Sequence, residues 1–160
     1  MIRILMGALL FTSVILGSEI ILRGDIDKVL RFDTQSLRAM APTVIDKLPV
    51  VCKSGEEKVA PSRYKGVLLS SLLDRTSFTA QSFKMYNTMA VIVTARDGYR
   101  VMFSYNELYN TTVGQQVIVA YEKDGRDLEN GALMLLSGGD TMTGPRHVRD
   151  VAEVEVRFLK

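Results

Sequence analysis

The chain has 160 residues, of which 47% are hydrophobic and 24% charged, and this composition excludes a disordered or fibrous protein and suits one globular domain. Its 20 basic and 18 acidic residues leave a net charge of +2, which argues against a dedicated nucleic-acid-binding protein because such proteins carry a clear basic excess. One cysteine and one histidine exclude an intramolecular disulfide, a multi-cysteine zinc or iron–sulfur site and a two-histidine metal site.

The first 18 residues have the pattern of a secretory signal peptide. Arg3 gives a positive start, residues 4–16 are mostly apolar, and Gly17 and Ser18 are small residues suited to cleavage. The apolar run is shorter than the roughly 20 residues of a membrane-spanning helix. An uncleaved membrane anchor and a buried first strand or helix are the alternatives. We therefore expect Sec-type export, a periplasmic or extracytoplasmic location and a mature domain of residues 19–160, with membrane contact only through an uncleaved N-terminal segment.

The first half of the mature domain predicts short strands and two helices. Asp33 and Thr34 offer an N-cap for the first helix. The polar residues 53–62 predict a loop, and the second helix is expected to begin after Gly66. The expected helices are residues 35–40 and 67–73, and the expected strands are residues 20–22, 29–32 and 43–51, the last ending at Cys52.

The second half predicts a hairpin and the strands that complete the sheet. Asp97 and Gly98 are a two-residue turn signal between strands at 89–95 and 99–104. A short helix at 105–109 and a turn at residues 124–125 follow. Further strands are expected at residues 116–121, 132–136 and 148–158. Many strands with two or three short helices predict a single α+β domain with a mixed or mainly antiparallel sheet.

Signatures of the common nucleotide and hydrolase sites are absent from the sequence. It contains no G-x-G-x-x-G, no P-loop and no G-x-S-x-G motif. We interpret Asp97 and Asp124, each followed by glycine, as turn residues and not as paired catalytic carboxylates.

The order of four segments resembles the small, stand-alone form of the sulfite-oxidase-like, molybdopterin-binding oxidoreductase domain. Together they span roughly residues 20–158, nearly the whole mature chain. The resemblance implies the α+β fold of that family. The four segments are residues 24–40; residues 50–55 with 64–73; residues 95–99 with Phe103 and Leu108; and residues 125–151, which include the Arg146-His147-Val148-Arg149 run.

The resemblance also implies a site. Its catalytic members ligate molybdenum through a cysteine at this strand end and hold the phosphate of the pterin with basic residues. By position, Cys52 is then the metal ligand and cofactor-binding residue, and Arg146 and Arg149 are the phosphate-binding residues. A thiolate is a soft ligand suited to such a metal, and guanidinium groups bind phosphate in a bidentate manner. The sequence departs from the family after the cysteine, where residues 53–56 replace a basic motif, and at residues 132–134, where another arginine is missing.

Three functions remain open at this stage. The first is a molybdopterin-dependent oxidoreductase that uses Cys52, Arg146 and Arg149. The second is a cofactor-free extracytoplasmic binding, sensory or interaction module, whose partner is a small-molecule ligand or a redox or sensor protein, with no nucleic acid. The third is a thiol enzyme with a Cys52–His147 dyad. Interpretations without a function are also open for two of these residues. Cys52 could be a small hydrophobic residue buried in the core, and His147 could be a solvated residue whose pKa is lowered by the flanking arginines.

Overall fold

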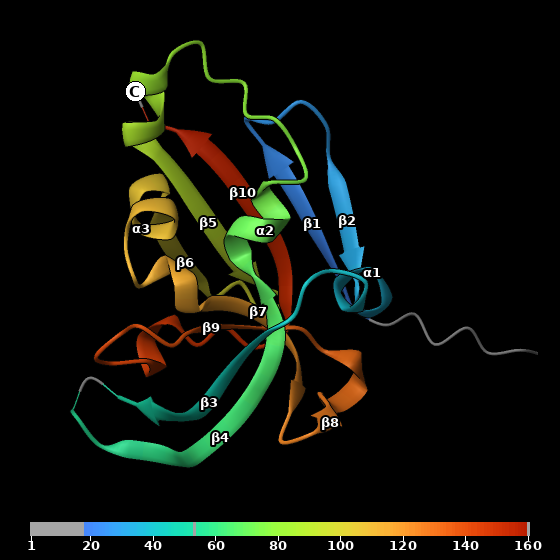
Figure 1. Cartoon of the computed structure of the whole chain (residues 1–160), viewed down its shortest axis with the longest axis vertical. Helices are drawn as coiled ribbons and strands as arrows, with labels where there is room; N and C mark the ends of the chain where they lie inside the picture. Colours follow the sequence, from blue (N-terminus) through green and yellow to red (C-terminus); the bar gives the residue numbers. More distant parts are fainter. Residues whose placement is uncertain (1–17, 53, 160) are drawn as a thin grey trace, which may run out of the picture.

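Two β-sheets organise the chain (Figure 1). The structure is a computed structural model that describes residues 18–52 and 54–159. Sheet 1 has five strands in the order β2-β1-β10-β5-β6, and sheet 2 has the order β3-β4-β7-β8 with β9 also paired to β7. The strands are β1 (Glu19–Gly24), β2 (Leu30–Asp33), β3 (Thr43–Val51), β4 (Glu57–Leu68), β5 (Met89–Ala95), β6 (Arg100–Ser104), β7 (Val117–Lys123), β8 (Arg126–Asp127), β9 (Met134–Ser137) and β10 (Val151–Phe158).

Sheet 1 brings the two ends of the described chain together. β1 pairs in parallel with β10, with Ile21 opposite Glu153, while β5 lies antiparallel on the other side of β10. The expected hairpin at the Asp97–Gly98 turn is confirmed, because β5 and β6 pair antiparallel from Ala90–Ser104 to Thr94–Arg100. Val154 and Val156 alternate with Glu155 along β10, so that one face of the sheet carries the apolar side chains.

Sheet 2 is centred on β7, which is buried on both faces. Val117, Val119 and Tyr121 of β7 belong to the main hydrophobic core. Ile118 and Ala120, which point to the opposite face, belong to a second cluster with side chains of β3, β4 and β9. β7 therefore joins the two hydrophobic clusters of the domain.

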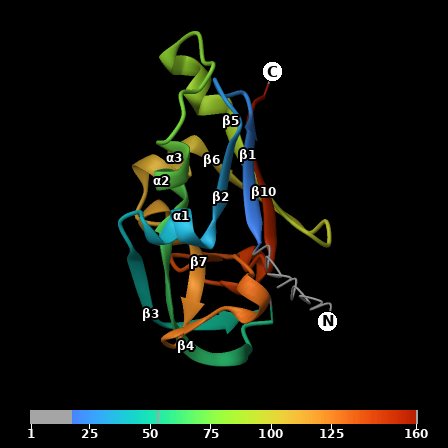
Figure 2. The same ribbon diagram turned by 90° about the vertical axis from the view of Figure 1, so that its right-hand side faces the viewer.

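Short helices cover one side of sheet 1. Asp33 caps α1 by accepting a 2.7 Å hydrogen bond from the Ser36 N–H, and Ser104 caps α3 by accepting one of 3.1 Å from the Glu107 N–H. Figure 2 shows α2 and α3 on the same side of the sheet that contains β1 and β10. The α-helices are α1 (Thr34–Arg38), α2 (Leu69–Leu73) and α3 (Tyr105–Asn110), and the 3₁₀ turns are η1 (Phe83–Thr88), η2 (Gly114–Gln116), η3 (Glu129–Gly131) and η4 (Gly144–Arg146).

The structure corrects two expectations about residues 53–73. The expected loop at 53–62 is wrong in its second half, because β4 begins at Glu57 and pairs with β3. Pro61 is tolerated there because the register shifts between the Val50–Val59 and Leu48–Ser62 pairs. At such a bulge a residue is not required to donate a hydrogen bond to the neighbouring strand, which proline cannot do. Gly66 lies inside β4 and not at a helix entry. A Cβ at Gly66 would lie 2.2 Å from the Val119 carbonyl oxygen, so only glycine allows β4 and β7 to approach this closely.

The described residues form one α+β domain with mostly antiparallel pairing and few short helices, which confirms the predicted fold class. Within residues 18–52 and 54–159, no helix is both long and apolar enough to cross a membrane. The predicted signal segment, apart from Ser18, lies outside the described residues.

Candidate functional site

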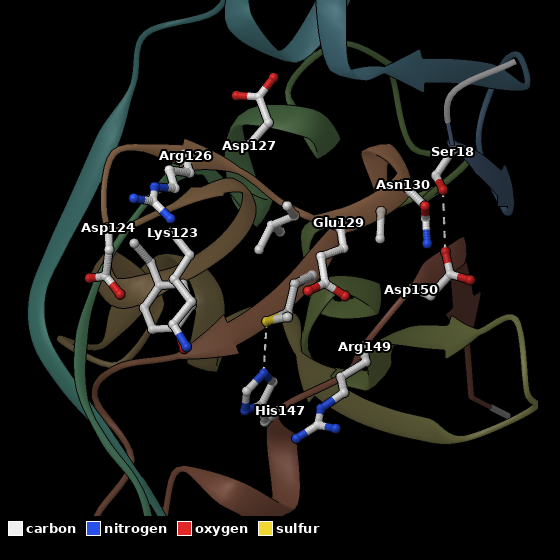
Figure 3. A pocket seen from close by; sticks show the side chains of 14 residues that line it. Ser18, Lys123, Asp124, Arg126, Asp127, Glu129, Asn130, His147, Arg149 and Asp150 are labelled. Carbon is white, nitrogen blue, oxygen red and sulfur yellow. Dashed lines mark hydrogen bonds between the residues drawn. The ribbon is translucent and has the colours of Figure 1, made fainter. Parts of the chain in front are cut away.

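A pocket of about 870 Å³ opens beside the second sheet, where three chain segments meet (Figure 3). The β7–β8 hairpin and η3 form one wall, the link from η4 to β10 forms another, and Ser18 closes the edge where β1 begins. This volume lies in the range of small-molecule sites in proteins. The lining residues are Ser18, Tyr64, Lys123, Asp124, Arg126, Asp127, Leu128, Glu129, Asn130, Ala132, Met134, His147, Arg149 and Asp150.

The pocket is built on three tight turns. Asp124, Asn130 and Asp150 all line it and all have a positive φ, between 51° and 56°. Asp and Asn adopt this left-handed conformation at lower cost than other residues with a side chain, because their short polar groups bond locally. At Asp124 the carboxylate accepts a 2.8 Å hydrogen bond from the Arg63 N–H, which fixes the turn between β7 and β8. Residues next to these turns, among them Lys123, Glu129 and Arg149, line the same pocket.

Most acidic side chains of the pocket already have partners. Asp127 is paired with Arg38, and Asp150 accepts a 3.1 Å bond from Arg96 Nε and a 3.3 Å bond from the Ser18 hydroxyl. Glu129 is the acidic lining residue that has no ion pair or hydrogen bond among the described residues.

The basic side chains of the pocket are less engaged. Lys123, Arg126 and Arg149 have no carboxylate within salt-bridge distance in the described part of the chain. Lys123 instead lies over the Tyr64 ring, with its Nζ 5.8 Å from the ring centroid. Two carboxylates of the pocket, Asp124 and Glu129, have no cationic partner among the described residues. Three unpaired basic groups against these two acidic groups leave an excess of one positive charge available to a ligand.

His147 lies between two of these cations. Figure 3 shows its ring between Lys123 and Arg149. The pKa of His147 is lowered to about 4, chiefly by burial and then by the charges of Arg149 and Lys123. The imidazole is therefore neutral at pH 7, and its Nε2 is 2.7 Å from the Met134 sulfur. The expected pKa direction is confirmed, but the chief cause is burial, since His147 is half-buried in the pocket wall and is not a solvated residue.

The structure does not bring the three residues that the resemblance implied into one pocket. Arg149 lines the pocket, whereas Arg146 and Cys52 do not. The Arg146 guanidinium forms two hydrogen bonds to Asp140 and one of 2.6 Å to Glu107, and it stacks over Phe103 at 4.4 Å. The two carboxylates raise the pKa of Arg146 and satisfy most of its donors.

Cys52 directly follows β3, in the hairpin that leads into β4. It is half-buried, its N–H donates to the Glu56 carbonyl (3.1 Å), and its own carbonyl accepts from the Gly55 N–H (2.9 Å). The backbone of η4 packs against it, because a Cβ at Gly144 would lie 3.6 Å from the Cys52 Cα. Gly66, after which the second helix was expected to begin, pairs with Thr43 at the other end of β3 from Cys52. We also expected Cys52 to lie next to that helix entry, and this expectation is wrong.

Sequence reasoning missed most of the pocket. Lys123, Arg126, Glu129 and Asn130 were not predicted as site residues, because nothing in a single sequence places the three turns together. The available signal was the Asp124–Gly125 turn flanked by two basic residues, which was interpreted as a turn only.

Comparisons with known proteins support the fold. No protein-family model matches the chain, and no curated protein matches it. Twelve chains of solved structures are similar to it, among them the sulfane dehydrogenase SoxCD from Paracoccus pantotrophus, with a TM-score of 0.66 and 15% sequence identity. The match covers 89% of this chain but only 38% of that chain. At this identity the likeness shows a shared fold, which agrees with the sulfite-oxidase-like fold that the sequence resemblance implied.

The site residues fit a molybdenum cofactor poorly. A thiolate ligand and the phosphate-binding groups must face one cavity, but Cys52 and Arg146 do not line the pocket that contains Arg149. Arg146 is in addition neutralised by two carboxylates. Within residues 18–52 and 54–159, no group of three or more His, Cys, Asp or Glu side chains is placed to hold a metal ion.

Proposed function

We propose that this domain is a cofactor-free, extracytoplasmic binding module that holds a small anionic ligand in the pocket between the β7–β8 hairpin and the η4–β10 link. The observation that carries the proposal is the pairing pattern of the lining residues. Asp127 and Asp150 have cationic partners, while Lys123, Arg126 and Arg149 have no carboxylate partner among the described residues.

The geometry favours an anion with several acceptor oxygens. Lys123 offers a point charge with three donors, and Arg149 offers a planar guanidinium that can bind two oxygens. The neutral His147 between them adds no charge at pH 7, and its ring N–H is directed at the Met134 sulfur. Charge-assisted hydrogen bonds of this kind contribute about 1.5–3 kcal/mol each in proteins. Phosphate, sulfate or a carboxylate would satisfy these donors.

Isothermal titration calorimetry with inorganic phosphate as the ligand tests this function. Arg149→Gln and Lys123→Gln should each weaken binding by about tenfold, which corresponds to one lost charge-assisted bond. Arg100→Gln is the matched control, because Arg100 is an exposed arginine of β6 outside the pocket. Its affinity should stay within twofold of the parent. Equal losses in all three variants would show that only the overall charge matters and would refute a built site.

A molybdopterin-dependent oxidoreductase is the second candidate, favoured by the fold shared with sulfane dehydrogenase. In that case Cys52 would be the molybdenum ligand and Arg149, with Arg146, would bind the phosphate, and a redox partner would be required. Molybdenum measured per chain in protein from its native compartment decides between the two candidates. Stoichiometric molybdenum that is lost in Cys52→Ser supports the oxidoreductase. Metal-free parent protein that binds phosphate supports the binding module.

A further inference from the structure

We propose that N-terminal processing completes the pocket through a cut between Gly17 and Ser18, one residue before the boundary expected from the sequence. This cut keeps Ser18 on the domain and turns its nitrogen into an ammonium group on a residue that lines the pocket. This inference rests on the proposed anion-binding function and adds a means by which the same site is controlled. Two independent observations meet at Ser18: the sequence pattern of residues 1–18 predicts cleavage near this residue, and the structure places Ser18 among the lining residues.

The position of Ser18 is fixed by the strand that follows it. Glu19 pairs with Asp33 of β2, and two residues later Ile21 pairs with Glu153 of β10. The half-buried Ser18 is therefore held at the pocket edge, where its hydroxyl donates to Asp150 Oδ1 at 3.3 Å. Figure 3 shows this contact at the rim, beside Asn130.

Cleavage changes the charge at this point. In the uncut chain the Ser18 nitrogen is a neutral amide, whereas after cleavage it is an α-amine, which is largely protonated at pH 7. The new ammonium belongs to the same residue whose hydroxyl donates to the Asp150 carboxylate. It offsets the repulsion that Asp150 exerts on an anion and adds to the positive potential of Lys123 and Arg149.

The expected effect of the charge is modest and measurable. One unit charge roughly 8 Å from a bound anion, in a medium of dielectric constant about 60, changes the affinity by about threefold. The processed form should therefore bind phosphate more tightly than a form in which the same nitrogen is an amide.

The experiment has two parts. First, the full 160-residue chain is exported from a bacterial host, and intact mass identifies its N-terminus, which should be Ser18. Second, phosphate affinity is measured for a chain that begins at Ser18 and for the same chain acetylated on the Ser18 amine. Acetylation restores the amide of the uncut chain and removes only the charge. The chain from Ser18 onward contains every described strand and both hydrophobic clusters.

The outcomes separate this inference from the function on which it rests. A threefold tighter binding by the free amine, with binding by both forms weakened by Arg149→Gln, supports the inference. Equal affinities of the two forms, with the Arg149→Gln effect retained, overturn the inference and leave the binding function in place. A mature N-terminus other than Ser18 also overturns it. If no form binds phosphate, the proposed function itself is refuted.

Discussion

Replacing Arg146 by Met is expected to destabilise the domain strongly while leaving anion binding unchanged. The Arg146 guanidinium forms three hydrogen bonds, two to Asp140 and one to Glu107, and covers the Phe103 ring. Its side chain is 22% exposed, and the side chains of Asp140 and Glu107 are 12% and 28% exposed. Methionine keeps much of the apolar stem, so the loss comes mainly from the charge and its bonds.

The magnitude follows from the two carboxylates that the variant leaves unpaired. Breaking a fully buried ion pair costs about 3–5 kcal/mol, and the partial exposure here reduces this to about 2–3 kcal/mol. For a domain of this size, the melting temperature should fall by roughly 6–10 °C. Chemical denaturation gives the free energy of unfolding, and calorimetry gives the phosphate affinity of the folded variant. The combination Arg146→Met with Asp140→Asn should recover part of the stability, because it removes one stranded charge.

A stability change below about 0.5 kcal/mol would refute the reasoning, since it would mean that the three bonds contribute nothing net. A tenfold loss of phosphate affinity without loss of stability would be equally damaging. It would show that Arg146 serves the ligand, as the family resemblance implied.

Three further predictions concern the pocket, an edge strand and a glycine. The pKa of His147 is lowered to about 4, chiefly by burial and then by Arg149 and Lys123, so the unfolded chain binds more protons than the folded one between pH 6.5 and 4. The contribution of His147 to stability should therefore be full above about pH 6.5 and be lost as the pH falls toward 4, and thermal melts of a His147→Gln variant should lack this part of the decline. Thr143→Val should cost about 1–3 kcal/mol in urea denaturation, because the buried Thr143 hydroxyl donates to the Pro49 carbonyl and accepts from the Val51 N–H; an unchanged midpoint would contradict it. Gly66→Ala should lower the free energy of unfolding by about 3 kcal/mol or more, because its Cβ would lie 2.2 Å from backbone, whereas Gly98→Ala, which has open space but a positive φ, should lower it by about 1 kcal/mol. Similar melting temperatures for the two variants would be inconsistent with the tight β4–β7 contact.

Local signals in the sequence were sufficient for much of the fold. The third strand was predicted with its observed bounds, because its β-branched residues lie between Pro42 and a turn. The helix cap at Asp33 and the hairpin at Asp97 and Gly98 were also recognised, since each depends on residues only two or three positions apart.

The start of β4 and the site could not be predicted in the same way. Residues 57–63 carry four polar side chains and Pro61, so their local pattern indicates a loop, and it is the pairing with β3 that makes them a strand. The fate of Arg146 depends on Glu107, 39 positions earlier in the chain, whose carboxylate the fold brings to it. The pocket depends on three turns that a single sequence does not place together.

The parallel pairing of β1 with β10 determines when this chain can fold. β10 lies between β1 and β5 in sheet 1, although it is the last strand in the sequence and β1 is the first. Contacts such as that between Leu22 and Val154 close a loop of more than a hundred residues, which places the domain among slowly folding, high-contact-order topologies. The first sheet cannot close during synthesis until the segment after Asp150 has emerged. A nascent chain stalled before that point would expose the apolar faces of β1 and β5 to chaperones.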